Sequence, residues 1–117
     1  MEFICYPKCT TCQKAEKWLI ERGIRYTKRD IKIDNPDYRE LCGYYKKSGL
    51  PLKRFFNTSG ILYKELSLKE KLPEMSEEQQ LKLLSTDGML VKRPILVTDD
   101  AVLLGFREDE WKKALEK

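Results

Sequence analysis

The chain of 117 residues contains no histidine. Histidine supplies the base in Ser-His-Asp and Cys-His sites and is a common zinc ligand, so its absence excludes those forms of nucleophilic catalysis and most zinc sites. No apolar stretch approaches the roughly 18 residues that a membrane helix requires. The net charge of +4 is small, and no motif for stacking on bases is present. We therefore expect neither a membrane protein nor a direct contact with nucleic acid.

The N-terminus also lacks the features of a secretory signal peptide, since Glu2 follows Met1 directly and opens a strand-like run. We therefore expect a cytoplasmic location, where thiols are kept reduced. Four cysteines in such a chain suggest catalysis, redox sensing or metal binding rather than structural disulfides. The length predicts one domain. We expect a monomer, because nothing in the pattern requires a large apolar surface patch.

Two of the cysteines stand where a short strand passes into a helix. The strand is predicted over residues 2–5 and the helix over residues 10–22, which places Cys9 and Cys12 at the junction. The first turn of a helix has N–H groups without intrahelical partners and a partial positive charge, and both stabilise a thiolate. The spacing from Cys9 to Cys12 is about one helical turn, close enough for a disulfide. We interpret Cys9 as a nucleophile and Cys12 as its resolving partner.

The other two cysteines are interpreted as residues without a redox role. Cys5 lies within the predicted first strand and is expected to be a small buried hydrophobic residue that points away from the start of the helix. Cys42 falls in a predicted helix and is interpreted as an incidental helix residue. A zinc site would need a fourth ligand, and only the distant Cys42 could supply it as a cysteine, so no metal and no bound cofactor are predicted.

The predicted elements run strand, helix, strand, then a helical segment, then strand, strand, helix. A second strand over residues 25–31 completes a βαβ unit, which implies a parallel pair and a right-handed crossover. The helical segment contains predicted helices at residues 37–48, 50–56, 67–72 and 76–84. Residues 94–97 and 101–104 are predicted to pair as antiparallel strands before a closing helix that has Trp111 on its apolar face.

This order predicts an α/β thioredoxin-like fold, βαβ then ββα, with an all-helical insertion between the two halves. The expected organisation is a single domain over residues 1–117. Its thioredoxin-like core would comprise residues 1–36 and 88–117, and its helical insertion residues 37–87.

An oxyanion substrate would require arginines near the nucleophile, because the planar guanidinium binds oxyanions bidentately. The candidates are Arg93, just before a predicted strand, and Arg107, just after one. In a thioredoxin-like fold the loop before the third strand lies beside the redox cysteine, and its proline is usually cis. Pro94 occupies that place, so we expect a cis Arg93–Pro94 peptide and a position of Arg93 close to Cys9.

Four motifs in this order make the chain similar to the arsenate-reductase-like (ArsC) family, which also contains the Spx-type transcription regulators. They are Tyr6-Pro7-Lys8-Cys9-Thr10-Thr11-Cys12-Gln13-Lys14-Ala15, Phe55-Phe56-Asn57-Thr58-Ser59-Gly60 with Tyr63 and Leu66, Lys92-Arg93-Pro94-Ile95-Leu96-Val97, and Gly105-Phe106-Arg107-Glu108-Asp109-Glu110. The resemblance runs over essentially the whole chain and implies the same thioredoxin-like fold.

The resemblance implies a function for three of the candidate residues. In arsenate reductases of this family, a cysteine matching Cys9 attacks arsenate and arginines matching Arg93 and Arg107 hold the oxyanion. The implied substrate is a small oxyanion or a thiol compound, and the implied electron donor is glutathione with glutaredoxin, or thioredoxin. This sequence has Asn57 at the position of a third arginine. It adds Cys12, which would allow an intramolecular disulfide with Cys9.

The spacing Cys9-x-x-Cys12 also resembles the redox switch of the Spx regulators, whose disulfide controls binding to the C-terminal domain of the RNA polymerase α subunit. Gln13 stands where both groups commonly carry arginine. The sequence thus leaves two functions open, a thiol-dependent oxidoreductase and a redox-sensing regulator that binds the RNA polymerase α subunit. Turnover that depends on Cys9 would identify the enzyme, and redox-dependent binding without turnover would identify the regulator.

Overall fold

The computed structural model describes residues 1–116, so Lys117 of the predicted domain lies outside the described residues. Its centre is a four-stranded sheet with the strand order β2-β1-β3-β4. The strands are β1 (Glu2–Cys5), β2 (Thr27–Asp30), β3 (Ile95–Val97) and β4 (Val102–Leu104). Strand β1 pairs in parallel with β2 and antiparallel with β3, and β3 pairs antiparallel with β4. The predicted βαβ unit and C-terminal hairpin are confirmed.

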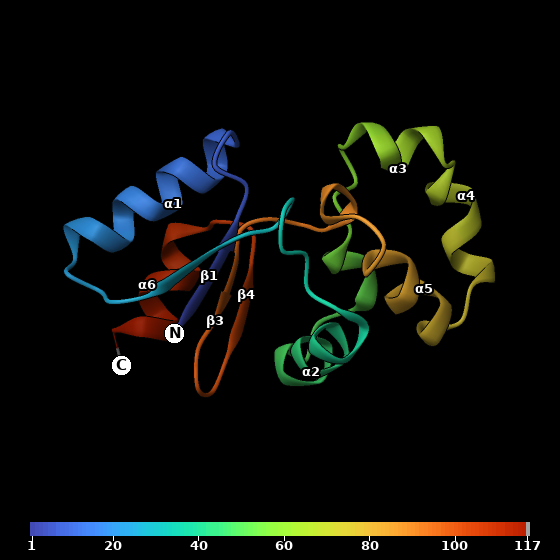
Figure 1. Cartoon of the computed structure of the whole chain (residues 1–117). Helices are drawn as coiled ribbons and strands as arrows, with labels where there is room; N and C mark the ends of the chain where they lie inside the picture. Colours follow the sequence, from blue (N-terminus) through green and yellow to red (C-terminus); the bar gives the residue numbers. More distant parts are fainter. Residues whose placement is uncertain (117) are drawn as a thin grey trace.

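Helices cover both faces of this sheet (Figure 1). Helices α1 (Thr10–Glu21) and α6 (Glu108–Leu115) lie on one side. Helices α2 (Tyr38–Ser48), α3 (Ile61–Glu65), α4 (Leu68–Lys71) and α5 (Glu77–Leu84) lie on the other. Three 3₁₀ turns complete the second group: η1 (Leu52–Phe55), η2 (Leu72–Glu74) and η3 (Gly88–Leu90). The segment between β2 and β3 is therefore helical, as predicted, apart from an isolated bridge between Phe56 and Val91.

Differences from the predicted elements are confined to short pieces. Helix α3 was not predicted, because it is only five residues long and directly follows the turn at residues 57–60. The predicted helix at residues 50–56 forms only the 3₁₀ turn η1, with Pro51 as the residue that precedes it. The predicted capping of α5 is confirmed, since Ser76 and Gln79 form a reciprocal capping box.

Alternate side chains of β1 belong to two separate hydrophobic cores. Phe3 and Cys5 face α1 and α6, whereas Ile4 faces the helical insertion. The first core is built from Phe3, Cys5, Cys12, Ala15, Trp18, Leu19, Leu96 and Trp111. The second includes Ile4, Ile31, Leu41, Phe55, Leu84 and Ile95. Each face of the sheet is thus closed by its own layer of helices.

Trp111 fixes the closing helix on the first core. Its ring makes edge contacts with Phe3, Trp18 and Phe106, with centroid distances of 6.4, 6.1 and 5.0 Å. Edge-to-face aromatic pairs contribute about 0.5–1.5 kcal/mol each beyond the burial of their surface. The indole Nε1–H donates to the carbonyl of Gly105 at 3.1 Å, so the buried ring leaves no unpaired donor. This bond also ties α6 to the turn that precedes it.

Among the contacts between the insertion and the sheet, two involve backbone atoms next to β2. A Cβ atom added to Gly88 would lie 2.0 Å from the carbonyl oxygen of Ile31, so only glycine allows η3 to approach the end of β2 this closely. The Nδ2 of Asn35 donates to the carbonyl of Leu84 at 3.0 Å. The end of the insertion is therefore held directly against the chain that leaves β2.

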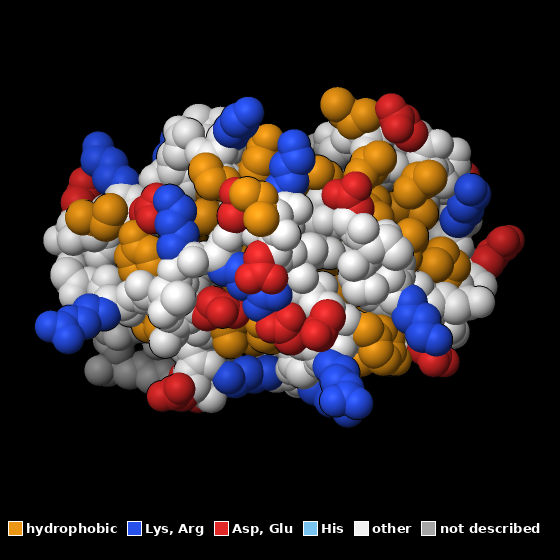
Figure 2. Space-filling view, viewed as in Figure 1, with side chains coloured by type: hydrophobic (Ala, Val, Ile, Leu, Met, Phe, Trp, Pro, Cys, Tyr) orange, Lys and Arg blue, Asp and Glu red, His pale blue; other side chains and the backbone are white. Residues whose placement is uncertain are grey.

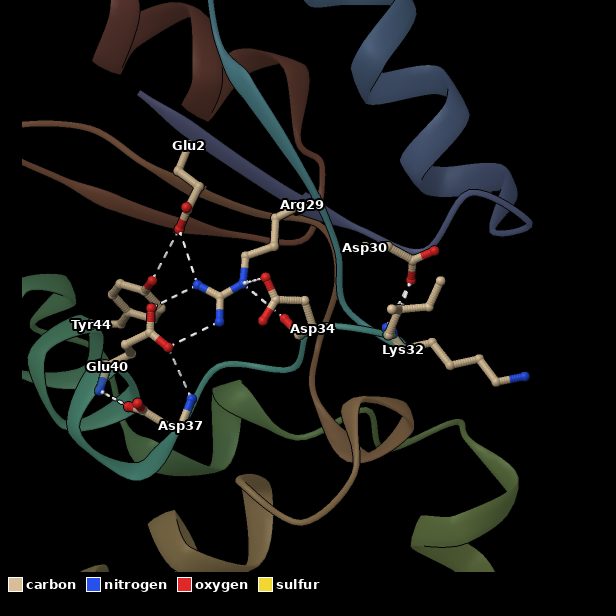
Figure 3. Close-up of polar contacts among 9 residues, drawn as sticks. Glu2, Arg29, Asp30, Lys32, Asp34, Asp37, Glu40 and Tyr44 are labelled. Carbon is tan, nitrogen blue, oxygen red and sulfur yellow. Dashed lines mark hydrogen bonds and ion pairs between the residues drawn. The ribbon is translucent and has the colours of Figure 1, made fainter.

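A third connection is an ionic network around Arg29 of β2 (Figure 3). Its Nη1 and Nη2 donate to the two carboxylate oxygens of Glu40 on α2 at 2.6 and 2.9 Å. Its Nε donates to the carbonyl of Asp34 at 2.8 Å, and Nη1 lies 3.6 Å from Glu2. The Arg29 side chain is only 12% exposed. A bidentate pair with little exposure binds more strongly than an ordinary surface ion pair.

The network extends into α2 through Glu2 and Glu40, two of the three carboxylates paired with Arg29. Tyr44 donates its hydroxyl to Glu2 at 3.2 Å. Glu40 also accepts from the N–H of Asp37, and Asp37 accepts from the N–H of Glu40, which forms a capping box. Figure 2 shows charged side chains of both signs gathered near the middle of this face, between the sheet and the helical insertion. The boundary between the two parts is therefore polar on this side.

The Arg29–Glu40 pair predicts a specific pH dependence of stability. The hydrogen bonds from Arg29 lower the pKa of Glu40 to about 2, whereas an unfolded glutamate titrates at about 4.3. The stabilisation is therefore complete above about pH 4.3 and is lost as the pH falls from there toward 2. We expect Glu40→Gln to lower the free energy of unfolding by about 1 kcal/mol at pH 7, allowing for partial solvent screening.

The measurement is urea-induced unfolding between pH 2 and pH 7 for both proteins. Below pH 4.3, the free energy of unfolding of Glu40→Gln should fall less steeply with decreasing pH than that of the wild type. Glu21→Gln is the matched control, because the Lys17–Glu21 pair is exposed and separated by 3.9 Å. Equal pH slopes for wild type and Glu40→Gln would contradict the assignment.

Candidate functional site

The chain between β1 and α1 forms a tight turn that places Cys9 at the start of the helix. Cys9 donates its backbone N–H to the carbonyl of Tyr6 at 2.9 Å, and its own carbonyl accepts from Gln13 at 3.0 Å. The side chain of Gln13 donates to the carbonyl of Pro7 at 2.9 Å. Cys9 is thus the N-cap residue of α1, and the expected position of this cysteine at the strand-to-helix junction is confirmed.

A cavity of about 710 Å³ opens in front of Cys9. Its lining includes Cys9, Arg93 and Arg107, which come from three separate parts of the sequence. The rest of the lining comprises Thr11, Arg54, Asn57, Ser59, Gly60, Ile61, Leu62, Met89, Lys92, Leu104, Gly105 and Phe106. The structure therefore brings three of the four predicted site residues to one cavity, together with residues of the helical insertion.

Two loops are joined behind the predicted arginines. The Arg93–Pro94 peptide is cis, as predicted. Gly105 donates its N–H to the carbonyl of Pro94 at 2.8 Å, so the turn that leads to Arg107 lies beside the loop of Arg93. Gly105 has a φ of +69°, and a Cβ atom there would meet the Lys92 side chain at 3.1 Å. The positive φ therefore favours glycine at the turn that leads to Arg107.

Arg93 is held by contacts that leave part of its guanidinium unpaired. The guanidinium carbon lies 5.2 Å from the centroid of the Tyr6 ring, and Nη1 lies 3.9 Å from the sulfur of Met89. Its Nε is buried and has no hydrogen-bond partner within residues 1–116. A buried unpaired donor costs about 1–3 kcal/mol. The Arg93 side chain thus reaches the cavity wall through contacts with Tyr6 and Met89.

Cys12 lies behind Cys9 in the first core and is only 2% exposed. Its sulfur accepts a hydrogen bond from the backbone N–H of Tyr6 at 3.3 Å. The pKa of Cys12 is raised above its usual range, chiefly by a side-chain hydrogen bond with Cys5 and then by burial, while Tyr6 and Cys9 act in the opposite direction. In the reduced protein Cys12 is therefore a protonated thiol in contact with two other cysteines.

The expectation that Cys5 points away from the start of the helix is wrong. Cys5 shares the face of β1 that α1 covers, and its thiol is paired with that of Cys12. The pKa of Cys5 is lowered, chiefly by this hydrogen bond, with a smaller contribution from Lys28. The expected burial of Cys5 is confirmed, at 1% exposure. All four cysteines are free thiols in this structure.

Sequence reasoning missed two cations of the cavity. Arg54 and Lys92 line it beside Asn57 and Arg93. Lys92 could have been found from its position next to Arg93 in the sequence. Arg54 precedes Asn57 by three residues, and η1 brings it to the cavity although Asn57 stands where a third arginine was expected. The cavity therefore has three arginines in its wall.

Within residues 1–116, no helix is both long enough and apolar enough to cross a membrane. The same residues contain no group of three or more histidine, cysteine, aspartate or glutamate side chains placed to hold a metal ion.

The fold, with a cysteine at the start of α1 and a cis-proline loop that also lines its cavity, defines a thioredoxin-like protein. The chain belongs to the ArsC family, whose model matches residues 5–114. The uncharacterised protein YusI of Bacillus subtilis is 51% identical over 97% of this chain and 96% of its own length. The crystal structure of a possible arsenate reductase from Streptococcus mutans is 39% identical, with a TM-score of 0.87 over 95% of this chain and 96% of that one.

Similarity also extends to transcription regulators of the same family. The global transcriptional regulator Spx 1 of Bacillus cereus is 26% identical over 95% of this chain and 83% of its own length. Relatives and structural neighbours therefore include both regulators and proteins described as arsenate reductases.

The exposures of the cysteines predict their order of alkylation. With iodoacetamide, Cys9 of the native reduced protein should react at least about tenfold faster than Cys5 or Cys12, because buried thiols react only when the structure opens. Mass spectrometry of tryptic peptides, with fragmentation of residues 9–14, separates Cys9 from Cys12. All four cysteines should react once the protein is unfolded in denaturant. Native labelling of Cys12 as fast as Cys9 would contradict the burial described here.

Proposed function

We propose that the protein is a thiol-dependent oxidoreductase that uses Cys9 to attack a small oxyanion or an oxidised thiol compound. The observation that carries the proposal is the shared cavity of Cys9, Arg93 and Arg107. The positions of Arg54 and Lys92 in the same lining support it, because they add positive charge that favours a bound anion. Membership of the ArsC family and the similarity to a possible arsenate reductase agree with this chemistry.

In this proposal the cations hold the anion while the start of α1 stabilises the thiolate. Arg93 and Arg107 approach the anion from the two joined loops, and Arg54 approaches it from the insertion. Guanidinium groups donate paired hydrogen bonds to oxyanions. The N–H groups at the start of α1 favour negative charge on Cys9 and on the bound oxygens. Binding and nucleophile activation then depend on the same electrostatic field.

For arsenate the reaction balances as two displacements. The Cys9 thiolate attacks arsenic and an arsenate oxygen leaves as water after taking up two protons. The Cys12 thiol then gives its proton to the departing arsenic oxyanion as its sulfur attacks the Cys9 sulfur. The electron pair of the sulfur–arsenic bond stays with arsenic, which becomes arsenite. The products are arsenite and a Cys9–Cys12 disulfide. Glutathione with glutaredoxin, or thioredoxin, would return the disulfide to two thiols by exchange.

The test is arsenate-dependent oxidation of NADPH, coupled once through glutathione and glutaredoxin and once through thioredoxin. Cys9→Ser should abolish turnover. Arg93→Lys and Arg107→Lys should each lower kcat/KM roughly ten- to a hundredfold, because each loses a charge-assisted bidentate contact of about 1.5–3 kcal/mol. Arg25→Lys is the matched control, since Arg25 precedes β2 and lies outside the cavity lining.

The electron donor that supports turnover reports on the role of Cys12. Activity with thioredoxin that disappears in Cys12→Ser would identify Cys12 as the resolving cysteine. Turnover that survives in Cys9→Ser would overturn the proposal. So would equal losses in Arg93→Lys, Arg107→Lys and Arg25→Lys, because a general effect of charge would then explain them.

A second function is favoured by the Cys9-x-x-Cys12 pair together with the similarity to Spx 1. The protein would then be a redox-sensing regulator in which the Cys9–Cys12 disulfide controls binding to the RNA polymerase α subunit. Binding of the reduced and oxidised proteins to the isolated α subunit, measured by calorimetry, tests it. Redox-dependent binding without arsenate turnover would favour the regulator over the enzyme.

A further inference from the structure

Three cysteine sulfurs meet at the junction of β1 and α1, and only one of them reaches the cavity. Cys5 and Cys12 belong to one buried core against which Cys9 packs, and Cys12 interacts with both other thiols. Cys5 is 1% exposed and Cys12 is 2% exposed, whereas Cys9 is half-buried and lines the cavity. Cys12 is therefore the middle member of a chain of three thiols that runs from the cavity into the first core.

We propose that Cys5 is a third redox-active thiol, which takes over the disulfide from Cys9 and leaves the protein with a buried Cys5–Cys12 bond. The proposal deepens the proposed function and rests on it, since Cys9 must first be oxidised against Cys12. In the step itself the Cys5 thiolate attacks the Cys12 sulfur of the Cys9–Cys12 disulfide. A Cys5–Cys12 bond forms, the Cys9–Cys12 bond breaks, and Cys9 leaves as a thiolate. No net oxidation or reduction occurs.

The geometry favours this exchange for two reasons. Thiol–disulfide exchange requires the attacked sulfur to be accessible to the incoming and leaving sulfurs together, and Cys12 is the cysteine that interacts with both others. The leaving group is the cysteine at the start of α1, where helix N–H groups stabilise the released thiolate. A better-stabilised leaving thiolate departs faster and shifts the exchange toward its release.

Two features of the core allow Cys5 to act as the acceptor. Cys5 and Cys12 lie buried in the same core across the strand–helix contact, and in the reduced protein their thiols are hydrogen-bonded. Lys28, on the strand paired with β1, contributes a favourable electrostatic interaction with a negative Cys5 sulfur, while Glu16 and Asp30 oppose it. Lys28 is thus the neighbouring group that would stabilise a negative Cys5 sulfur during the exchange.

The exchange would change what the site can do. With the disulfide moved to Cys5–Cys12, Cys9 is again a free thiolate in front of the arginines. A second adduct on Cys9 would then find no resolving thiol at Cys12 and would need a thiol from solution. The buried Cys5–Cys12 bond would also be harder for a protein reductant to reach than a bond that includes Cys9.

The three possible disulfides, Cys9–Cys12, Cys5–Cys12 and Cys5–Cys9, can be distinguished by peptide mapping. Trypsin cuts after Lys8 and Lys14, which gives one peptide of residues 1–8 with Cys5 and one of residues 9–14 with Cys9 and Cys12. The experiment uses the full-length Cys42→Ser protein, oxidised with one equivalent of diamide and quenched at intervals with N-ethylmaleimide. Diamide replaces the substrate, so the result does not depend on whether arsenate is turned over.

We expect an internal disulfide in peptide 9–14 at early times, followed by peptides 1–8 and 9–14 joined through Cys5 and Cys12 with N-ethylmaleimide on Cys9. The joined form should become the major oxidised species. The proposal would be overturned if peptide 9–14 with its internal disulfide were the only oxidised species at all times. A linkage of Cys5 to Cys9 would also overturn it.

The Cys5→Ala variant, made in the Cys42→Ser protein, is the matched comparison. It should stop at the Cys9–Cys12 disulfide, and thioredoxin should reduce this form faster than it reduces the Cys5–Cys12 form. Equal reduction rates would contradict the protected position of the buried bond. Circular dichroism establishes that the variant is folded, and the linkage map of the Cys42→Ser protein decides the proposal even where Cys5→Ala does not fold.

Discussion

Strand β1 carries the constraint on which the rest of the structure depends. It is hydrogen-bonded to β2 on one side and to β3 on the other, and its alternate side chains fill two different cores. A shift of register by one residue would exchange Phe3 and Cys5 with Ile4 and would disrupt both cores together. The fixed register determines where the chain leaves the sheet at Tyr6. It thereby sets the start of α1 and the position of Cys9.

Features that depend on neighbouring residues could be predicted from the sequence. The periodicity around Cys9 and Cys12, the hairpin before α6 and the capping box at Ser76 are local patterns, and the structure contains each of them. Pro94 could be placed because the order of elements already indicated the loop in which it lies. The positions of Arg93 and Arg107 beside one cavity followed from that same order.

Features that depend on packing between distant segments could not be predicted in this way. Arg29 meets Glu40 across 11 residues of sequence, and nothing in either local pattern distinguishes this pair from other exposed charges. Arg54 reaches the cavity only because η1 turns the chain there. Cys5 was placed on the wrong face because its strand is short, and the choice between two faces depends on which helix covers each one.

The lack of histidine has a consequence for the supply of protons in this cavity. Its three arginines keep their charge at every physiological pH, because the guanidinium group does not lose its proton in proteins. The wall of the cavity thus attracts anions but has no histidine, the side chain that ordinarily exchanges protons near neutrality. Protons consumed in a reduction there must come from the thiols themselves or from water. The arginines therefore attract the substrate, whereas the thiols or water deliver the protons.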